Sequence, residues 1–208
     1  MVITHTEVQK KNQCRVSVFI DGRYAFGIDE EDWFKLNLYV GQEITEQEID
    51  RINEQCNYSK AKKLAVKYIL YKKRTSFEVH QKLEQSGFDA YIAERVIEEM
   101  ERLAYIDDRD YVCKYIKYAV TFKKYGQYRI RLELQQKGID EKIISAQLDE
   151  FELDERSVLE PLVRKKIASY TCNDEKSLNN IKNYFIRKGY PFEMINQVIN
   201  DIIRECRN

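Results

Sequence analysis

Residues 83–92 read LEQSGFDAYI, and this stretch decides the fold because it returns twice further along the chain. Its counterparts are residues 134–143 (LQQKGIDEKI) and 185–194 (FIRKGYPFEM). The glycines of the three stretches, Gly87, Gly138 and Gly189, lie 51 residues apart. Self-similarity at a fixed period is the mark of a tandem repeat. The sequence therefore predicts three copies of one structural unit.

The same 51-residue offset aligns apolar residues throughout the unit. Within each copy these residues follow the helical period, which is typical of helices that bury one face. We therefore expect the aligned positions to form the cores of three small helical domains. Four of the aligned sets are Ala65, Ile116 and Ile167; Val79, Ile130 and Ile181; Leu83, Leu134 and Phe185; and Met100, Phe151 and Ile202.

Each unit divides into three helices, and the first unit illustrates how. Residues 62–73 carry apolar side chains at helical spacing and form the first helix. Thr75 and Glu78 have the spacing of a capping box, which opens the second helix. Gly87 ends that helix because glycine tolerates the left-handed conformation after a C-terminus, and Asp89 caps the third helix.

The first 58 residues have a different pattern. Residues 15–20 and 23–28 alternate polar and apolar side chains on either side of Asp21-Gly22, which is the strongest short signal for a β-hairpin. Residues 3–10 can supply a third strand, since a lone hairpin is only marginally stable in water. A short acidic-capped helix containing Trp33 follows, and residues 46–55 predict another helix.

The predicted fold class is mainly α. Three tandem three-helix repeats of helix-turn-helix appearance form an elongated array, and a small α+β module with a β-hairpin precedes them. The period sets the expected domain boundaries at residues 1–58 for the N-terminal module, 59–108 for repeat 1, 109–158 for repeat 2 and 159–208 for repeat 3.

The basic and acidic residues of the chain are equal in number but are concentrated in different segments. The 35 basic and 35 acidic residues give a formal net charge of zero. Residues 59–88 nevertheless hold 8 basic and 2 acidic groups, and residues 89–110 hold 3 and 8. Repeat 2 has the same alternation, with 7 and 1 over residues 111–138 and 2 and 8 over residues 139–160. The first two helices of each repeat therefore form basic stripes, which suit a nucleoprotein partner.

The candidate contact residues are the basic and aromatic side chains of these stripes. Arginine grips a carboxylate or phosphate with two hydrogen bonds, lysine supplies a point charge, and tyrosine can stack on a base or pack on a partner. A solvated face with local ion pairs remains an alternative for each single residue. The candidates are Lys72, Lys73 and Arg74 in repeat 1, and Lys123, Lys124, Tyr125, Tyr128, Arg129 and Arg131 in repeat 2.

Several classes of protein are disfavoured. The sequence has no apolar run long enough to cross a bilayer and no signal peptide, so we expect a cytoplasmic protein without a membrane partner. Five cysteines without a CxxC pair, and two histidines, predict reduced thiols and no metal site. Because nucleotide-binding and nucleophile motifs are absent, neither a cofactor nor an enzymatic activity is expected.

Specific motifs in repeats 1 and 2 resemble the RecX family of RecA regulators. Residues 103–108 (LAYIDD), Tyr111 and residues 125–139 (YGQYRIRLELQQKGI) carry the resemblance in repeat 2. Residues 74–79 (RTSFEV) are similar to the Arg-Ser motif at the second helix of the family's first repeat. The likeness extends over residues 59–208, and the N-terminal strands resemble the extension of longer members. Ala104 departs from a glycine common in the family, and repeat 3 lacks an Arg-Ser pair.

The resemblance implies a non-enzymatic modulator. RecX-like proteins bind along the groove of the RecA filament on single-stranded DNA, inhibit its ATPase, strand-exchange and coprotease activities, and so modulate recombination and repair. We therefore expect a monomer whose partner is this filament, with DNA as a further direct contact. The alternative is an autonomous DNA-binding protein of helix-turn-helix type, which would bind naked duplex with steep salt dependence.

Overall fold

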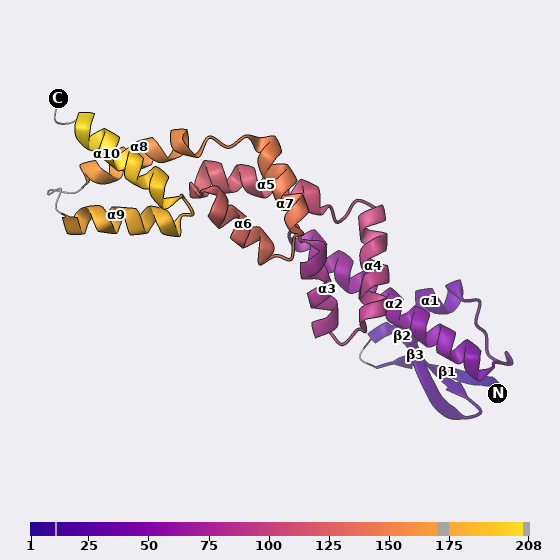
Figure 1. Ribbon diagram of the computed structural model, residues 1–208. Coiled ribbons are helices and arrows are strands. Elements are labelled where there is room, and N and C mark those ends of the chain that lie inside the picture. The colour runs from indigo at the N-terminus through magenta and orange to yellow at the C-terminus, as the bar shows by residue number, and fades with distance from the viewer. Residues whose placement is uncertain (11, 170–174, 206–208) are drawn as a thin grey trace. The chain divides into compact units, whose positions relative to one another are not determined.

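The computed structural model describes residues 1–10, 12–169 and 175–205, and the chain divides into two compact units (Figure 1). Unit 1 comprises residues 1–72 and 79–105, and unit 2 comprises residues 73–78 and 106–208. The division falls within the second helix of repeat 1, so the first turn of this helix belongs to unit 2. The domain boundaries drawn from the 51-residue period remain predictions.

An antiparallel sheet opens unit 1, with β1 (Ile3–Gln9), β2 (Asn12–Ile20) and β3 (Arg23–Asp29) in the order β1-β2-β3. Between β2 and β3, Asp21 and Gly22 have φ values of +49° and +76°, as a type I′ turn requires. The predicted hairpin and its third strand are both confirmed. The short helix α1 (Glu30–Lys35) follows, as expected, and its Trp33 packs partly buried against the core of the sheet.

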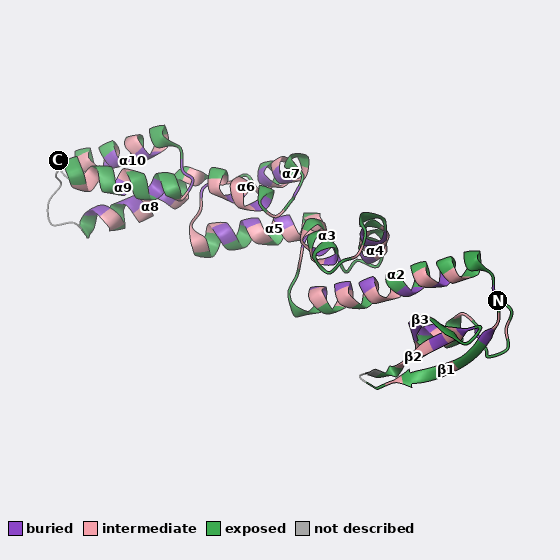
Figure 2. Ribbon diagram, turned by 90° about the horizontal axis from the view of Figure 1, so that it is seen from below, coloured by how far each residue is buried: buried purple, intermediate pink, exposed green. Residues whose placement is uncertain are grey.

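The helix α2 (Glu46–Tyr71) corrects the sequence-based prediction of two separate helices at 46–55 and 62–73. It opens with a capping box between Thr45 and Glu48, and no glycine or proline interrupts the segment between the two predicted helices. Figure 2 shows buried residues at intervals along the helix. Ile52 and Cys56 belong to the core of the sheet, whereas the second half of α2 serves as the first helix of repeat 1.

Repeat 1 continues with α3 (Ser76–Gln85) and α4 (Ala90–Arg102). The predicted capping box is present, since the Thr75 hydroxyl accepts from the Glu78 N–H at 3.2 Å and the Glu78 carboxylate accepts from the Thr75 N–H at 3.1 Å. Gly87 has a φ of +87°, and the Asp89 carboxylate caps α4 through the Ile92 N–H at 2.8 Å. The sequence signals therefore located these helix ends correctly.

Repeat 2 contains α5 (Asp108–Tyr118), α6 (Gln127–Gln135) and α7 (Glu141–Phe151). A π-helical turn, η1 (Ala119–Lys123), extends α5, and Lys124 then adopts a left-handed φ of +53°. No pattern in the sequence predicted this turn. Asp107 caps α5 by accepting from the Asp110 N–H at 2.9 Å.

Repeat 3 contains α8 (Glu155–Ala168), α9 (Glu175–Arg187) and α10 (Phe192–Glu205). Three of the predicted apolar sets, those that begin at Ala65, Val79 and Leu83, are buried in all three repeats. The predicted fold class is thereby confirmed: tandem three-helix repeats follow a module with an antiparallel sheet.

None of the helices in the described ranges combines the length and the apolar character that a membrane span needs. Of the cysteines, Cys14, Cys56 and Cys113 form no disulfide with one another, and Cys172 and Cys206 lie outside the described residues.

Candidate functional site

The candidate residues of repeat 1 differ in what surrounds them. Lys72 follows the last residue of α2 and is exposed. The Lys73 ammonium lies 2.8 Å from the Asp110 carboxylate. The Arg74 guanidinium lies 3.6 Å from the Glu78 carboxylate, and its side chain is only 18% exposed. Lys73 and Arg74 therefore already have carboxylate partners within unit 2.

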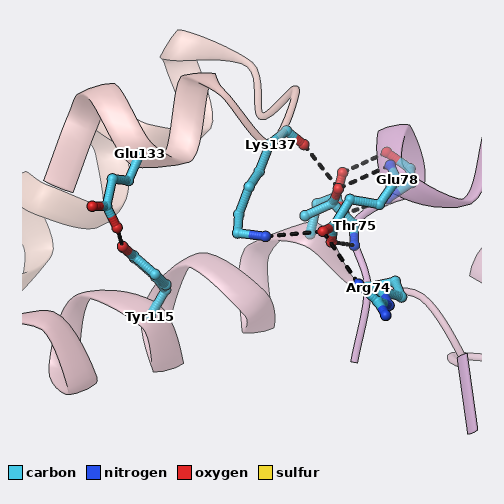
Figure 3. A network of polar contacts seen from close by, with 8 residues as sticks. Arg74, Thr75, Glu78, Tyr115, Glu133 and Lys137 are labelled. Atoms are coloured by element: carbon cyan, nitrogen blue, oxygen red, sulfur yellow. Dashed lines mark hydrogen bonds and ion pairs between the residues drawn. The ribbon is translucent and has the colours of Figure 1, made fainter. Parts of the chain in front are cut away.

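The start of α3 is held by residues of repeat 2, as Figure 3 shows. The Thr75 side chain is fully buried, and its hydroxyl donates to the Lys137 carbonyl at 2.8 Å. The Lys137 ammonium bonds the Glu78 carboxylate at 2.9 Å. Although burial opposes ionisation of Glu78, the bonds from Lys137 and the Thr75 N–H hold its pKa below the usual range. The Asp108 carboxylate also accepts from the Ser76 N–H at 3.0 Å.

The same kind of contact recurs one repeat later. The Gly126 N–H donates to the Lys188 carbonyl at 2.9 Å, and position 188 lies 51 residues after Lys137. The Glu155 carboxylate accepts from the Gln127 N–H at 2.5 Å, in the role that Asp108 has at α3. Burial raises the pKa of Glu155, although this backbone N–H favours its charged form. The first turn of each of these second helices is therefore capped by the next repeat, which sequence reasoning did not foresee.

The Glu133 carboxylate forms ion pairs with two of the candidate cations of repeat 2. It accepts a hydrogen bond from the Tyr115 hydroxyl (Figure 3) and lies 3.1 Å from the Lys123 ammonium and 2.9 Å from the Arg129 guanidinium. Burial disfavours its charged form, but these donors outweigh that effect and hold its pKa below the usual value. Burial, together with the Glu133 carboxylate, raises the pKa of Tyr115.

The Tyr125 ring is surrounded by cations. Lys123 lies 5.1 Å, Arg129 5.7 Å and Lys188 4.9 Å from the ring centroid, within the range of cation–π attraction. Tyr125 therefore helps to hold these cations beside one another at the junction of repeats 2 and 3.

The other candidates of repeat 2 fall into two groups. Arg131 forms an ion pair with Glu141 and donates to the Ser145 hydroxyl at 2.8 Å. In contrast, Tyr128 is 70% exposed on α6. Within residues 1–10, 12–169 and 175–205, no carboxylate lies within ion-pair distance of Lys124.

A groove of about 450 Å³ brings repeat 3 to the same surface. We call it the lysine groove, because among the residues that the structure describes its lining contains five lysines and no acidic side chain. A second hollow of about 410 Å³ shares Tyr184 and Lys188 with it and adds Arg129 and Arg187. The lining of the lysine groove consists of Phe122, Lys123, Lys124, Leu162, Lys165, Lys166, Ser169, Tyr184, Phe185 and Lys188.

The sequence candidates covered only one side of the lysine groove. Lys123 and Lys124 were predicted, whereas Lys165, Lys166 and Lys188 of repeat 3 were not. A signal existed, because residues 161–190 contain 7 basic and 2 acidic groups. The capping contacts at Gly126 bring the two basic segments together, and no local pattern encodes those contacts.

Another groove, of about 710 Å³, lies between α1 and α2 in unit 1. Its lining mixes Glu31 and Asp32 with several lysines. One of these, Lys63, bonds the Asp29 carboxylate at 2.7 Å. Lys35 and Lys62 likewise have carboxylate partners, Glu31 and Glu99, so most of the lysines of this groove already take part in ion pairs.

Comparison with known proteins accounts for this architecture. Three family models match: the RecX N-terminal domain over residues 1–45, the first RecX three-helix domain over 61–100 and the second over 107–148. A regulatory protein RecX from Clostridium tetani is 36% identical over 205 residues, which cover 97% of this chain and 94% of the relative. The chain belongs to the RecX family of regulatory proteins.

Other RecX proteins agree with this assignment. A RecX from Staphylococcus epidermidis is 30% identical, over 96% of this chain and 75% of the relative. A crystal structure of a regulatory protein RecX superposes with a TM-score of 0.72 at 25% identity, covering 96% of this chain and 98% of that one. The RecX structure from Lactobacillus salivarius gives a TM-score of 0.62 at 26% identity, over 70% of this chain and 96% of that one.

Proposed function

We propose that this chain regulates RecA. In this proposal it binds the RecA filament on single-stranded DNA through the basic faces of its repeats, and it inhibits the ATPase, strand-exchange and coprotease activities of the filament. Membership of the RecX family is the observation that carries the proposal. A regulator of this kind would act in the cytoplasm, as a monomer and without a cofactor.

The geometry of repeat 2 supports particular contact residues. Lys123, Arg129 and Arg131 each have a carboxylate partner, so their charges are partly satisfied within the chain. Lys124 has no such partner among the described residues, and Tyr128 exposes most of its ring. A partner that meets Lys124 and Tyr128 breaks no internal ion pair. These two residues are therefore the first candidates of repeat 2 for contact with the filament.

The alternative of an autonomous helix-turn-helix protein finds less support. The start of α6 is covered, because the Gly126 and Gln127 N–H groups donate to repeat 3. The third helix of repeat 2, α7, carries Glu141, Asp149 and Glu150 against a single lysine, and acidic side chains repel a phosphate backbone. Neither helix therefore offers the basic, open end that enters a major groove.

The direct test is the ATP turnover of RecA on single-stranded DNA with increasing amounts of this protein. We expect turnover to fall and to level off at saturation. The double variant Lys124→Gln with Tyr128→Ala should need about tenfold more protein for the same inhibition, because two contacts are lost.

The matched control is Lys142→Gln with Tyr39→Ala, which makes the same chemical changes at exposed positions that are not among the proposed contact residues. It should inhibit like the unchanged chain. Unaltered RecA turnover at saturating wild-type protein would contradict the proposed function, and equal loss in both variants would contradict the assignment of the contact face.

A further inference from the structure

The lysine groove contains cations that the chain does not neutralise. In the part of the chain that the structure describes, no carboxylate lies within ion-pair distance of Lys124, Lys165 or Lys166. Lys188 adds a further positive charge to the groove, because its ammonium donates to the neutral Lys123 carbonyl, at 2.7 Å, and that bond leaves its charge in place. Like charges gathered in a groove repel one another unless an anion sits among them.

The kind of charge favours phosphate over carboxylate. The charged side chains of its described lining are all lysines, which are point charges, and none is an arginine, whose planar fork matches a carboxylate. A row of singly charged phosphates meets such point charges without any requirement for bidentate geometry. The groove therefore suits a phosphodiester backbone better than an acidic protein surface.

Exposed aromatic rings adjoin the lysines. Phe122 lines the groove and is 74% exposed, and its ring lies 5.6 Å from that of Tyr118, which is 49% exposed. Exposed aromatic faces beside a basic groove bind unpaired bases by stacking, and the bases of a duplex are not available for this. The combination thus indicates a single strand.

The groove is a composite of two repeats that are fixed to each other. Its repeat 2 side comes from η1 and Lys124, and its repeat 3 side comes from α8 and α9. The Tyr190 hydroxyl and the Lys188 ammonium donate to the carbonyls of Lys124 and Lys123, at 3.3 and 2.7 Å. π-helical turns are rare and frequently lie at functional sites, and η1 carries Phe122 and Lys123 at this edge.

We propose that the lysine groove binds the phosphodiester backbone of single-stranded DNA directly, with Phe122 and Tyr118 as a stacking platform for its bases. This rests on the proposed function, in which the chain meets a filament that contains such DNA, and it names the component of the filament that this surface contacts. It also gives repeat 3 a binding role that the sequence candidates did not include.

The experiment measures fluorescence anisotropy of a short labelled oligothymidylate with the full chain, in the absence of RecA, over a range of salt concentrations. We expect binding that weakens linearly on a log–log scale with salt. The variant Lys165→Ala with Lys166→Ala should bind about tenfold more weakly. Its salt slope should be smaller in magnitude by about 1.4, because two phosphate contacts are lost.

The matched control is Lys142→Ala with Lys176→Ala, which removes two exposed lysines of the same unit outside the groove. Circular dichroism of both variants checks that their folds are intact. Equal affinities and slopes for the groove and control variants would overturn the inference, as would stronger binding to a duplex of the same length. If oligothymidylate does not bind while RecA turnover is still depressed, the direct DNA contact is wrong and the proposed function stands, with the groove facing RecA instead.

Discussion

At the scale of single residues, Ala104 holds a backbone conformation that favours glycine. It follows α4 with a φ of +57°, and the Tyr105 N–H closes the helix end by donating to the Met100 carbonyl at 2.8 Å. The left-handed region costs a residue with a Cβ about 1–2 kcal/mol. Ala104 is exposed, so Ala104→Gly should raise the free energy of unfolding by about 0.5–1 kcal/mol in urea denaturation, after the greater freedom of unfolded glycine is allowed for. Ala90→Gly in α4 should lower it, and a loss in both variants would contradict this account.

The residue scale also shows what the sequence could predict. Caps such as Thr75 with Glu78, and Asp89, were located correctly because each acts on a backbone group three residues away. The partner of the candidate Lys73 was not, because Asp110 lies 37 positions further along the chain, and neither was the contact of Lys188 with the Lys123 carbonyl across 65 positions. Residue type indicated a charge, and only the tertiary structure decided whether that charge was already satisfied.

At the scale of elements, the end of each second helix packs differently although the glycine is the same. A Cβ at Gly87 would meet nothing within 4 Å, whereas one at Gly138 would lie 2.1 Å from the Phe77 ring and one at Gly189 would lie 2.3 Å from the Arg129 nitrogen. Each Gly→Ala change also places alanine at a positive φ, at a cost of about 1–2 kcal/mol. The Cβ of Phe77 would lie 2.3 Å away at Gly138 and the Cβ of Arg129 2.5 Å away at Gly189, and neither atom moves when its side chain rotates. We therefore expect a further loss of about 1–3 kcal/mol for Gly138→Ala and Gly189→Ala beyond that for Gly87→Ala, measured by urea denaturation. Equal losses at the three positions would refute the packing argument.

The helix α2 shows why element boundaries were harder to predict than elements. Apolar spacing correctly indicated helix on both sides of residues 56–61, and the gap between the two predictions reflected only a weaker pattern there. Cys56 and Ala61 are in fact both buried, Cys56 in the N-terminal core and Ala61 outside the cluster of residues that forms this core. One helix serves two cores, so its apolar face changes partner along its length, and a single period does not describe it.

At the scale of the whole molecule, the formal charge of zero conceals an arrangement. The counts of basic and acidic residues by segment indicated which helices are basic and which are acidic. They could not indicate which of these charges pair with one another. In the structure some of the basic groups form internal ion pairs and are therefore weaker candidates for contact with a partner. Examples are Arg131 with Glu141 and Lys73 with Asp110. Lys124, Lys165 and Lys166, which have no carboxylate partner in the described ranges, lie together at the junction of repeats 2 and 3. The site thus depends on repeat docking, which a net charge does not reveal.

Docking also determines how unit 2 should open. The Gly126 N–H bonds the Lys188 carbonyl and the Gln127 N–H bonds the Glu155 carboxylate, so opening repeat 3 leaves the first turn of α6 without its caps. Repeats 2 and 3 should therefore open as one cooperative unit in native-state hydrogen exchange. Gly189→Ala, which disturbs the junction, should lower the opening free energies of amides in α6 and in α9 by the same amount. A decrease confined to α9 would show instead that each repeat opens alone, and that the caps contribute little to the stability of repeat 2.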